Sequence, residues 1–300
     1  GEKRDALTPS LDVERLLDPE MAALLSQWSM GELTPAVLPA MRSLGDTPVE
    51  GLSDDVERTD HVVRDDPNLV VRVHRPKASR GALPCVYSIH GGGYVMGSRQ
   101  MDNVLLDRWC SELECVCVSV EYRLAPETPF PGALEDCYAG LEWVNDHAAQ
   151  LGVDRDRIGI SGASAGGGLA AALALLVRDR GELTVRFQLL RYPMLDDRQI
   201  TTSSCWEVPI WNPAANRFGW QSYLGELYGA PHVPDHAAPS RCKNLAGLPP
   251  AFVCVGTLDG FLDEDVTFAQ QLNHAGVPAE LHVYPGVPHG FDILMPDAWI

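Results

Sequence analysis

The sequence predicts an α/β protein with a mostly parallel central sheet and helices on both faces. Its 300 residues are 45% hydrophobic and 21% charged, which is typical of a globular chain with a sizeable core. From residue 84 onward, short apolar segments alternate with longer amphipathic ones, and this alternation favours parallel strands joined by helices. Before residue 84, two alternating segments flank a turn at 65–68, so we expect an antiparallel hairpin at one edge of the sheet.

The individual elements follow from hydrophobic periodicity. Residues 1 to about 50 show helical spacing of the apolar side chains Leu16, Leu17, Met21, Leu24, Leu25 and Trp28. The expected strands after the hairpin cover residues 84–89, 114–120, 157–161, 184–192, 251–255 and 279–284. The expected helices between them cover residues 102–113, 133–150, 164–180 and 263–275.

One segment, between residues 195 and 241, contains no strand–helix unit. It is rich in the aromatic residues Trp206, Trp211, Phe218, Trp220, Tyr223 and Tyr228. Most of these fit a small core of the segment's own, but an insertion after a strand can also cover the carboxyl ends of the sheet, where ligands bind. We expect a single α/β domain over residues 1–300, with a mainly helical cap from about 1–50 and about 195–240.

Composition restricts the partners and the compartment. A formal net charge of −18 disfavours nucleic acid and anionic membranes, which require clustered Lys and Arg. No apolar run is long enough to span a bilayer, and residues 1–5 lack an apolar signal segment. The sequence leaves the oligomeric state open, including a homo-oligomer.

The cysteines and histidines indicate a reduced, metal-free protein. Of eight scattered cysteines, Cys85, Cys115, Cys117 and Cys254 lie in apolar strand-like runs, which suits buried free thiols and a cytoplasmic location. Alternation places Cys115 and Cys117 on one face of their strand. The nine histidines show no metal-ligand spacing, so we expect neither a metal nor another cofactor.

A candidate nucleophile lies in the stretch G-A-S-A-G at 162–166. It joins the expected strand 157–161 to an alanine-rich helix, and this is the context of the nucleophile elbow of α/β-hydrolases. The motif alone fits an ordinary glycine-rich turn equally well. With its context, it makes Ser164 the candidate nucleophile and aims the N–H of Ala165 at a developing oxyanion.

Candidates for the acid and the base follow two later strands. Asp259 comes just after the strand that begins at residue 251, and His289 lies beyond the strand that begins at residue 279. The chain order Ser, Asp, His is that of α/β-hydrolases. Asp263, Glu264 and Asp265 are competing acids, but carboxylates at the start of a helix also favour its dipole, and we prefer that role for them.

The run H-G-G-G-Y at 90–94 is a candidate oxyanion loop. Three glycines let the backbone approach a substrate carbonyl and direct N–H groups at it. A phosphate cradle is the alternative, but the chain has no G-K-[ST] sequence after these glycines.

Together these motifs resemble the hormone-sensitive-lipase-like esterases, a branch of the α/β-hydrolase fold. The motifs are H-G-G-G-Y at 90–94, E-Y-R-L-A-P-E at 121–127, G-A-S-A-G-G at 162–167, L-D-x-x-x-D-E at 258–264 and H-G-F at 289–291. A stretch at 237–250 is similar to heroin esterase-like bacterial members. One departure is Ala163, where many members of the family carry Asp.

The resemblance implies a site as well as a fold. It implies a triad of Ser164, Asp259 and His289 and no cofactor. It implies an oxyanion hole from Gly92, Gly93 and Ala165, with Gly91 shaping the loop. We expect Tyr94, Trp206 and Trp211 to bind the substrate in a short, apolar acyl or alcohol pocket.

The resulting hypothesis is a serine carboxylesterase that hydrolyses short-chain esters through an acyl-enzyme. Two alternatives stay open. One is a non-catalytic small-molecule receptor on the same fold, which the presence of both Asp259 and His289 disfavours. The other is an amidase or lactonase with the same triad, which no motif separates from an esterase.

Overall fold

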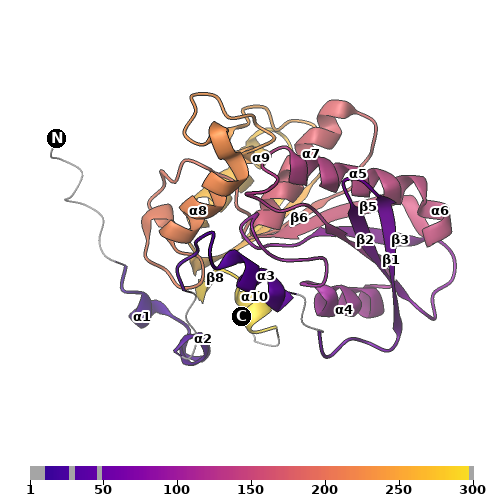
Figure 1. Cartoon of the computed structure of the whole chain (residues 1–300), viewed down its shortest axis with the longest axis horizontal. Helices are drawn as coiled ribbons and strands as arrows, with labels where there is room; N and C mark the ends of the chain where they lie inside the picture. Colours follow the sequence, from indigo (N-terminus) through magenta and orange to yellow (C-terminus); the bar gives the residue numbers. More distant parts are fainter. Residues whose placement is uncertain (1–10, 27–30, 46–48, 297–300) are drawn as a thin grey trace.

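The central sheet is the framework of the molecule. The computed structural model describes residues 11–26, 31–45 and 49–296, and within them eight strands form one sheet of order β1-β2-β4-β3-β5-β6-β7-β8 (Figure 1). The strands are β1 (Val56–Arg64), β2 (Leu69–Pro76), β3 (Leu83–Ile89), β4 (Val116–Glu121), β5 (Val153–Ala163), β6 (Gln188–Arg191), β7 (Ala251–Leu258) and β8 (Ala279–Pro288). The β1–β2 and β2–β4 pairs are antiparallel and all later pairs are parallel, so the predicted edge hairpin is confirmed.

Helices cover both faces of this sheet. In Figure 1, α5 (Gly132–Asp146) and α7 (Ala165–Arg180) lie on one face, and α4 (Asn103–Leu113) lies on the other. Near the far edge, α9 (Leu262–His274) packs against β7 and β8. Every residue of α7 from Ala165 to Val177 is buried, which explains why this helix has alanine and leucine on all of its faces.

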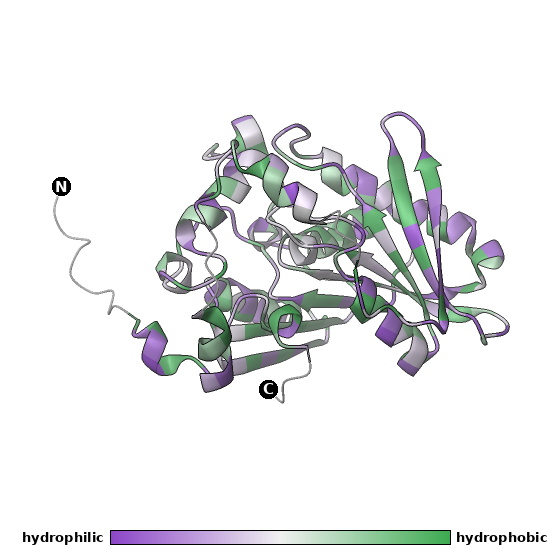
Figure 2. Ribbon diagram, turned by 60° about the horizontal axis from the view of Figure 1, so that its bottom comes forward, coloured by the Kyte–Doolittle hydropathy of each residue, from purple (hydrophilic) through white to green (hydrophobic). Residues whose placement is uncertain are grey.

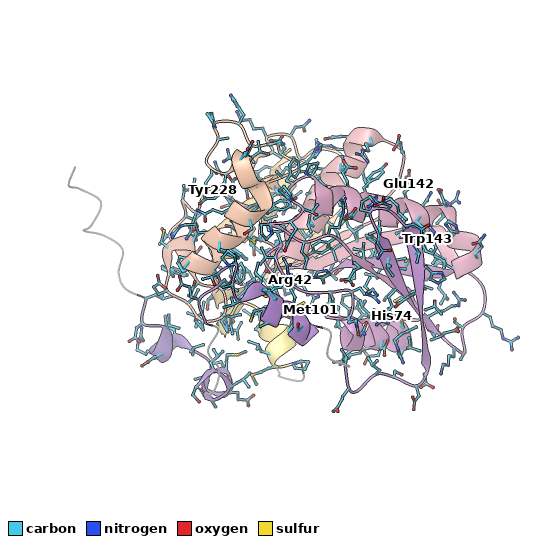
Figure 3. The ribbon with its side chains drawn as sticks, viewed as in Figure 1. Arg42, His74, Met101, Glu142, Trp143 and Tyr228 are labelled. Carbon is cyan, nitrogen blue, oxygen red and sulfur yellow. The ribbon has the colours of Figure 1, made fainter. Side chains whose placement is uncertain are left out.

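Burial also explains the two kinds of strand pattern. The inner strand β4 is buried along almost its whole length and has a continuous apolar sequence, whereas the edge strand β8 alternates between exposed and half-buried positions. Figure 2 shows hydrophobic residues concentrated on the strands of the sheet. On the α4 side, buried His74 of β2 contacts Asp107 at 2.9 Å (Figure 3).

The strands β5, β7 and β8 are longer than predicted, and two further elements differ from the prediction. The helix expected over residues 133–150 is divided into α5 and α6 (Ala148–Leu151), because His147 leaves helical geometry and its ring contacts the Trp143 carbonyl at 2.8 Å. The strand expected over 184–192 is shortened to β6, which pairs with its neighbours only over residues 188–191.

The N-terminal segment is helical, as predicted, in three short pieces. They are α1 (Val13–Leu16), α2 (Pro19–Leu25) and α3 (Leu38–Gly45), whereas Trp28 lies outside the described residues. Asp18 caps α2 by accepting hydrogen bonds from the backbone N–H groups of Glu20 and Met21, and Pro19 occupies the first helical position.

Both longer N-terminal helices contact loops at the carboxyl ends of the strands. Met21 of α2 is fully buried in a cluster with Val287 and Phe291. Arg42 of α3 donates to the Val95 carbonyl at 2.8 Å and pairs with Glu127 at 2.8 Å (Figure 3). These contacts attach the N-terminal segment to the two ends of the predicted site.

The segment 195–240 contains no strand, as predicted. It holds the 3-10 turns η1 (Ser203–Cys205) and η2 (Gly225–Leu227) and the helix α8 (Pro213–Leu224), and the turn η3 (Pro239–Arg241) follows at its end. All eight cysteines are free, and the four expected in strands are buried. Cys115 lies just before β4 and not in it, but its Sγ is 3.7 Å from that of Cys117 in β4. Among the described helices, none has the length and hydropathy needed to cross a bilayer.

Candidate active site

Ser164 occupies the turn between β5 and α7. Its φ of 57° and ψ of −123° lie in a region that residues with a side chain rarely adopt. Backbone hydrogen bonds hold this conformation: the Ser164 N–H donates to the Arg191 carbonyl at 2.9 Å, and the Ser164 carbonyl accepts from Met194 at 2.9 Å and Gly168 at 3.0 Å. Strain held in this way by its surroundings is typical of functional sites.

Close backbone approaches explain the glycines of this turn. A Cβ at Gly162 would overlap the carbonyl of Gly166, and a Cβ at Gly166 would overlap the carbonyls of Ile89 and His90. The turn therefore requires glycine at both positions for steric reasons.

The three predicted polar side chains meet at the carboxyl ends of the strands. His289 Nε2 lies 2.8 Å from Ser164 Oγ, and His289 Nδ1 lies 2.7 Å from Asp259 Oδ2. Asp259 also accepts a hydrogen bond from the Phe261 N–H at 2.9 Å. Asp259 is fully buried, while Ser164 is 7% and His289 5% exposed. This arrangement can pass a proton from a hydroxyl to an imidazole whose other nitrogen faces a carboxylate.

Aromatic rings surround the imidazole. Tyr192 and Phe261 contact the His289 ring edge-on, with centroids at 4.7 and 5.1 Å, and Trp211 lies at 6.4 Å. These contacts restrict the orientation of the His289 ring.

The predicted oxyanion loop borders the nucleophile. A Cβ built on Gly91 would lie 3.0 Å from the Ala163 carbonyl oxygen and 3.4 Å from Ser164 Cβ. Gly92 and Gly93 continue the loop with φ values of 114° and 59°. Ala165 is the first residue of α7, where backbone N–H groups lack partners within the helix.

Comparison with known proteins identifies the fold family. Residues 86–293 match the family profile described as alpha/beta hydrolase fold. The chain belongs to the α/β-hydrolases. The resemblance to hormone-sensitive-lipase-like esterases is confirmed by the relatives of this hydrolase.

Several of these relatives are esterases. Esterase LipI of Mycobacterium tuberculosis is 38% identical over 210 residues, an alignment that covers 69% of this chain and 65% of LipI. Carboxylesterase NlhH of the same organism is 35% identical over 75% of this chain and 71% of NlhH. The structure of a bacterial heroin esterase superposes with a TM-score of 0.88 at 39% identity, covering 95% of this chain and 93% of that one. These relatives place the hydrolase among the carboxylic ester hydrolases.

Not every predicted residue of this hydrolase contributes its side chain to the site. Tyr94 was expected to bind substrate, but its ring is buried against Tyr223, with centroids 4.0 Å apart, and its hydroxyl donates to the Met194 carbonyl at 3.2 Å. Tyr94 therefore packs behind the oxyanion loop. His90 also supports the loop: its Nδ1 contacts the Gly91 carbonyl at 2.8 Å, and its ring stacks on Tyr122.

Trp206 and Trp211 line the same small cavity, and Trp211 also lies near the His289 ring. Together with Pro213 and Phe261 they line a cavity of about 10 Å³, close to the space that a single water needs. The Trp211 ring lies so close to Gly93 that a Cβ there would overlap it. Trp211 is thus packed between the oxyanion loop and the His289 ring.

The carboxylates after Asp259 do more than begin a helix. Asp263 accepts from the Ser203 N–H at 2.8 Å, and Glu264 accepts from the N–H groups of Leu195 at 2.8 Å and Asp196 at 3.1 Å. Asp265 is fully buried, and neither of its oxygens has a hydrogen-bond partner among the described residues. Burial raises the pKa of Glu264 and of Asp265 well above the usual range. The predicted role at the start of a helix therefore describes these carboxylates only in part, because Asp263 and Glu264 also bind the backbone of segment 195–240.

A polar network lies beside the sheet. Arg123 pairs with Asp136 at 2.7 Å, and Glu121 pairs with Arg99 at 2.8 Å. Sequence reasoning missed a partly buried ion pair at 2.7 Å between Arg191 and Asp292. Its only local signal is a charged residue inside the apolar run F-D-I-L just after His289. No group of three or more metal-binding side chains is arranged to hold an ion in the part of the chain that the structure describes.

Proposed function

We propose that this hydrolase cleaves short-chain carboxylic esters through an acyl-enzyme formed on Ser164. The observation that carries the proposal is the pair of contacts on His289, 2.8 Å to Ser164 Oγ and 2.7 Å to Asp259 Oδ2. It is supported by the esterases among the relatives of the chain.

In the first half-reaction, neutral His289 accepts the Ser164 proton at Nε2 while Oγ bonds to the ester carbonyl carbon. The carbonyl electron pair moves onto oxygen, and the N–H groups of Gly92, Gly93 and Ala165 stabilise this oxyanion. One such donor is typically worth about 3 kcal/mol of barrier. Asp259 accepts a hydrogen bond from Nδ1 and stabilises the imidazolium.

The intermediate then collapses. The bond between the carbonyl carbon and the alkoxy oxygen breaks, and His289 returns its proton from Nε2 to the leaving alcohol. Water repeats the sequence on the acyl-enzyme: His289 removes a proton from the water, and Ser164 leaves with that proton as the acid is released.

Close aromatic packing near His289 supports small substrates. The rings of Trp206, Trp211 and Phe261 leave a cavity of only about 10 Å³ between them, so we expect little room for a long acyl or alcohol chain on this side of His289. An ethyl acetate hydrolase of Pseudomonas putida is 30% identical over 92% of both chains, and its name agrees with a small substrate. We place the cap in about 1–50 and about 195–240 of a single domain, supported by the contacts of Met21, Arg42 and Trp211 around the site.

The test is hydrolysis of p-nitrophenyl acetate, butyrate and decanoate by wild type, Ser164→Ala and Ser161→Ala. Ser161 is a matched control, since it is a buried serine three residues earlier, on β5. We expect wild type and Ser161→Ala to prefer the short chains and Ser164→Ala to lose activity by a factor of about 10⁴ or more.

Two outcomes would contradict the proposal. Equal activity of Ser164→Ala and wild type would exclude Ser164 as the nucleophile. A folded wild type without esterase activity would favour the receptor alternative. A parallel assay with anilides and lactones as substrates distinguishes an amidase or lactonase from an esterase.

A further inference from the structure

We propose that Tyr192 and Asp292, held by Arg191, are positioning residues that fix the His289 imidazole against Ser164. We call Arg191, Tyr192, Asp292 and Asp102 the Arg191 cluster. Its role rests on the proposed function, because positioning matters only if His289 acts on Ser164.

The cluster holds the segment that carries His289. Asp292 lies three residues after His289, in α10 (Phe291–Leu294). Its Oδ1 accepts a hydrogen bond from the Tyr192 hydroxyl at 2.6 Å, and its Oδ2 accepts one from Arg191 Nη1 at 2.7 Å. Both carboxylate oxygens are therefore bound by two consecutive residues at the end of β6, so α10 is fixed in position and in rotation.

The backbone of the same two residues also bonds to Ser164 and to β7. The Arg191 carbonyl accepts the hydrogen bond from the Ser164 N–H at 2.9 Å, and the Tyr192 N–H donates to the Cys254 carbonyl at 2.6 Å. The Tyr192 ring also contacts the His289 ring edge-on. One dipeptide thus bonds to the backbone of Ser164 and to the helix that follows His289, and it sets the distance between them.

Burial makes the cluster resistant to rearrangement. The Arg191 side chain is only 6% exposed and has a second carboxylate, Asp102, at 3.3 Å. A buried guanidinium that loses a partner carries an uncompensated desolvation cost, so the paired arrangement is strongly preferred. Burial also raises the pKa of Tyr192 well above its usual range, which keeps its hydroxyl a hydrogen-bond donor.

The placement of His289 affects catalysis because the rate of acyl transfer is sensitive to small displacements of the reacting groups. A misplacement of about 1 Å far from the reacting atoms can reduce the rate about 100-fold. The Tyr192 hydroxyl and Asp292 act through the placement of His289, so their loss affects kcat more than substrate binding.

The decisive variant is Tyr192→Phe, which keeps the ring against His289 and removes only the hydroxyl. The matched control is Tyr138→Phe: Tyr138 of α5 is also buried, and its hydroxyl also donates to a carboxylate, Glu182, at 2.6 Å. The assay uses p-nitrophenyl acetate at a temperature well below the melting temperatures of both variants. We expect the kcat of Tyr192→Phe to be about tenfold lower than that of the wild type, with a KM within about twofold of it. Tyr138→Phe should retain wild-type kcat and KM.

Two further measurements separate positioning from general destabilisation. The double variant Asp292→Asn, Tyr192→Phe should have a kcat no lower than that of the less active single variant, because the Tyr192 hydroxyl acts only through its contact with Asp292. Hydrogen exchange of residues 286–294 should be faster in Tyr192→Phe and unchanged in Tyr138→Phe.

The outcomes distinguish this proposal from the function on which it rests. An active wild type with equal kcat in Tyr192→Phe and Tyr138→Phe, or a change in KM alone, would overturn the positioning role and leave the esterase proposal intact. A wild type that neither hydrolyses esters nor reacts with a fluorophosphonate would overturn both.

Discussion

Asp265 combines complete burial with a lack of hydrogen-bond partners for its carboxylate among the described residues. Burial, with Glu264 and Asp259 nearby, raises its pKa well above the usual range. The folded state therefore keeps the Asp265 proton at pH values where the unfolded chain has released it. The free energy of unfolding then falls as pH rises from the unfolded pKa, about 4, toward the raised folded value.

The first prediction uses this linkage. Asp265→Asn replaces the titrating carboxyl by a neutral amide, so we expect it to raise the free energy of unfolding at pH 7 to 8. The gain should shrink as pH falls through the unfolded pKa of about 4 and approach zero below it, where Asp265 is protonated in both states. Urea unfolding between pH 4 and pH 8 measures it, with exposed Asp65→Asn as the control. A gain that is independent of pH would show that Asp265 does not titrate as argued.

The second prediction concerns the size of the substrate. Trp211→Ala removes a ring that lies between Gly93 and His289 and lines the cavity of about 10 Å³. We expect the ratio of kcat/KM for p-nitrophenyl decanoate to that for the acetate to rise about tenfold or more, since longer chains gain space and apolar contact. Trp143→Ala is the control: Trp143 lies on α5, where its ring contacts His61 and His147 and not His289, so the ratio should stay unchanged. If Trp206→Ala and Trp211→Ala both leave it unchanged, the assignment of these residues to the cap is wrong.

At the scale of elements, the joint between β5 and α7 has the least steric freedom. Gly166→Ala would place a Cβ against the carbonyls of Ile89 and His90, so β3 and α7 must separate. We expect a loss of about 1–3 kcal/mol in stability, as for overpacked sites, together with reduced activity. Chemical unfolding of Gly166→Ala beside Gly31→Ala measures this, because Gly31 has open space around it and no positive φ. Equal losses would show that the close approach of Gly166 to Ile89 and His90 does not limit stability.

Elements whose sequence matches their burial were predictable. β4 is a continuous apolar run because both of its faces are covered, and α7 is apolar all round for the same reason. The break at His147 was not predictable, because a ring contact with the Trp143 carbonyl leaves no mark on hydrophobic periodicity. The length of β6 likewise depends on where its neighbours β5 and β7 pair with it.

At the scale of the molecule, the parallel sheet explains how much of the site the sequence could reveal. Ser164, Asp259 and His289 each follow a strand, and parallel strands bring their carboxyl ends to one edge, so position in the chain predicts proximity in space. The Arg191–Asp292 pair joins residues 101 positions apart and belongs to no motif. Side chains such as Tyr94 were misplaced for a related reason: a motif fixes the backbone of its loop, but the packing around it decides which way a ring turns.

The strand order also has a consequence for synthesis of the chain. β8 is the last strand in the sequence and lies at the edge of the sheet, and the residue that faces Ser164 comes directly after it. On a ribosome, the other strands can pair and the elbow can form before His289 has been made. If His289 is the base, a nascent chain stopped shortly before residue 289 has a nearly complete scaffold and no means of activating its serine. Hydrolysis then begins only when translation has passed the last strand.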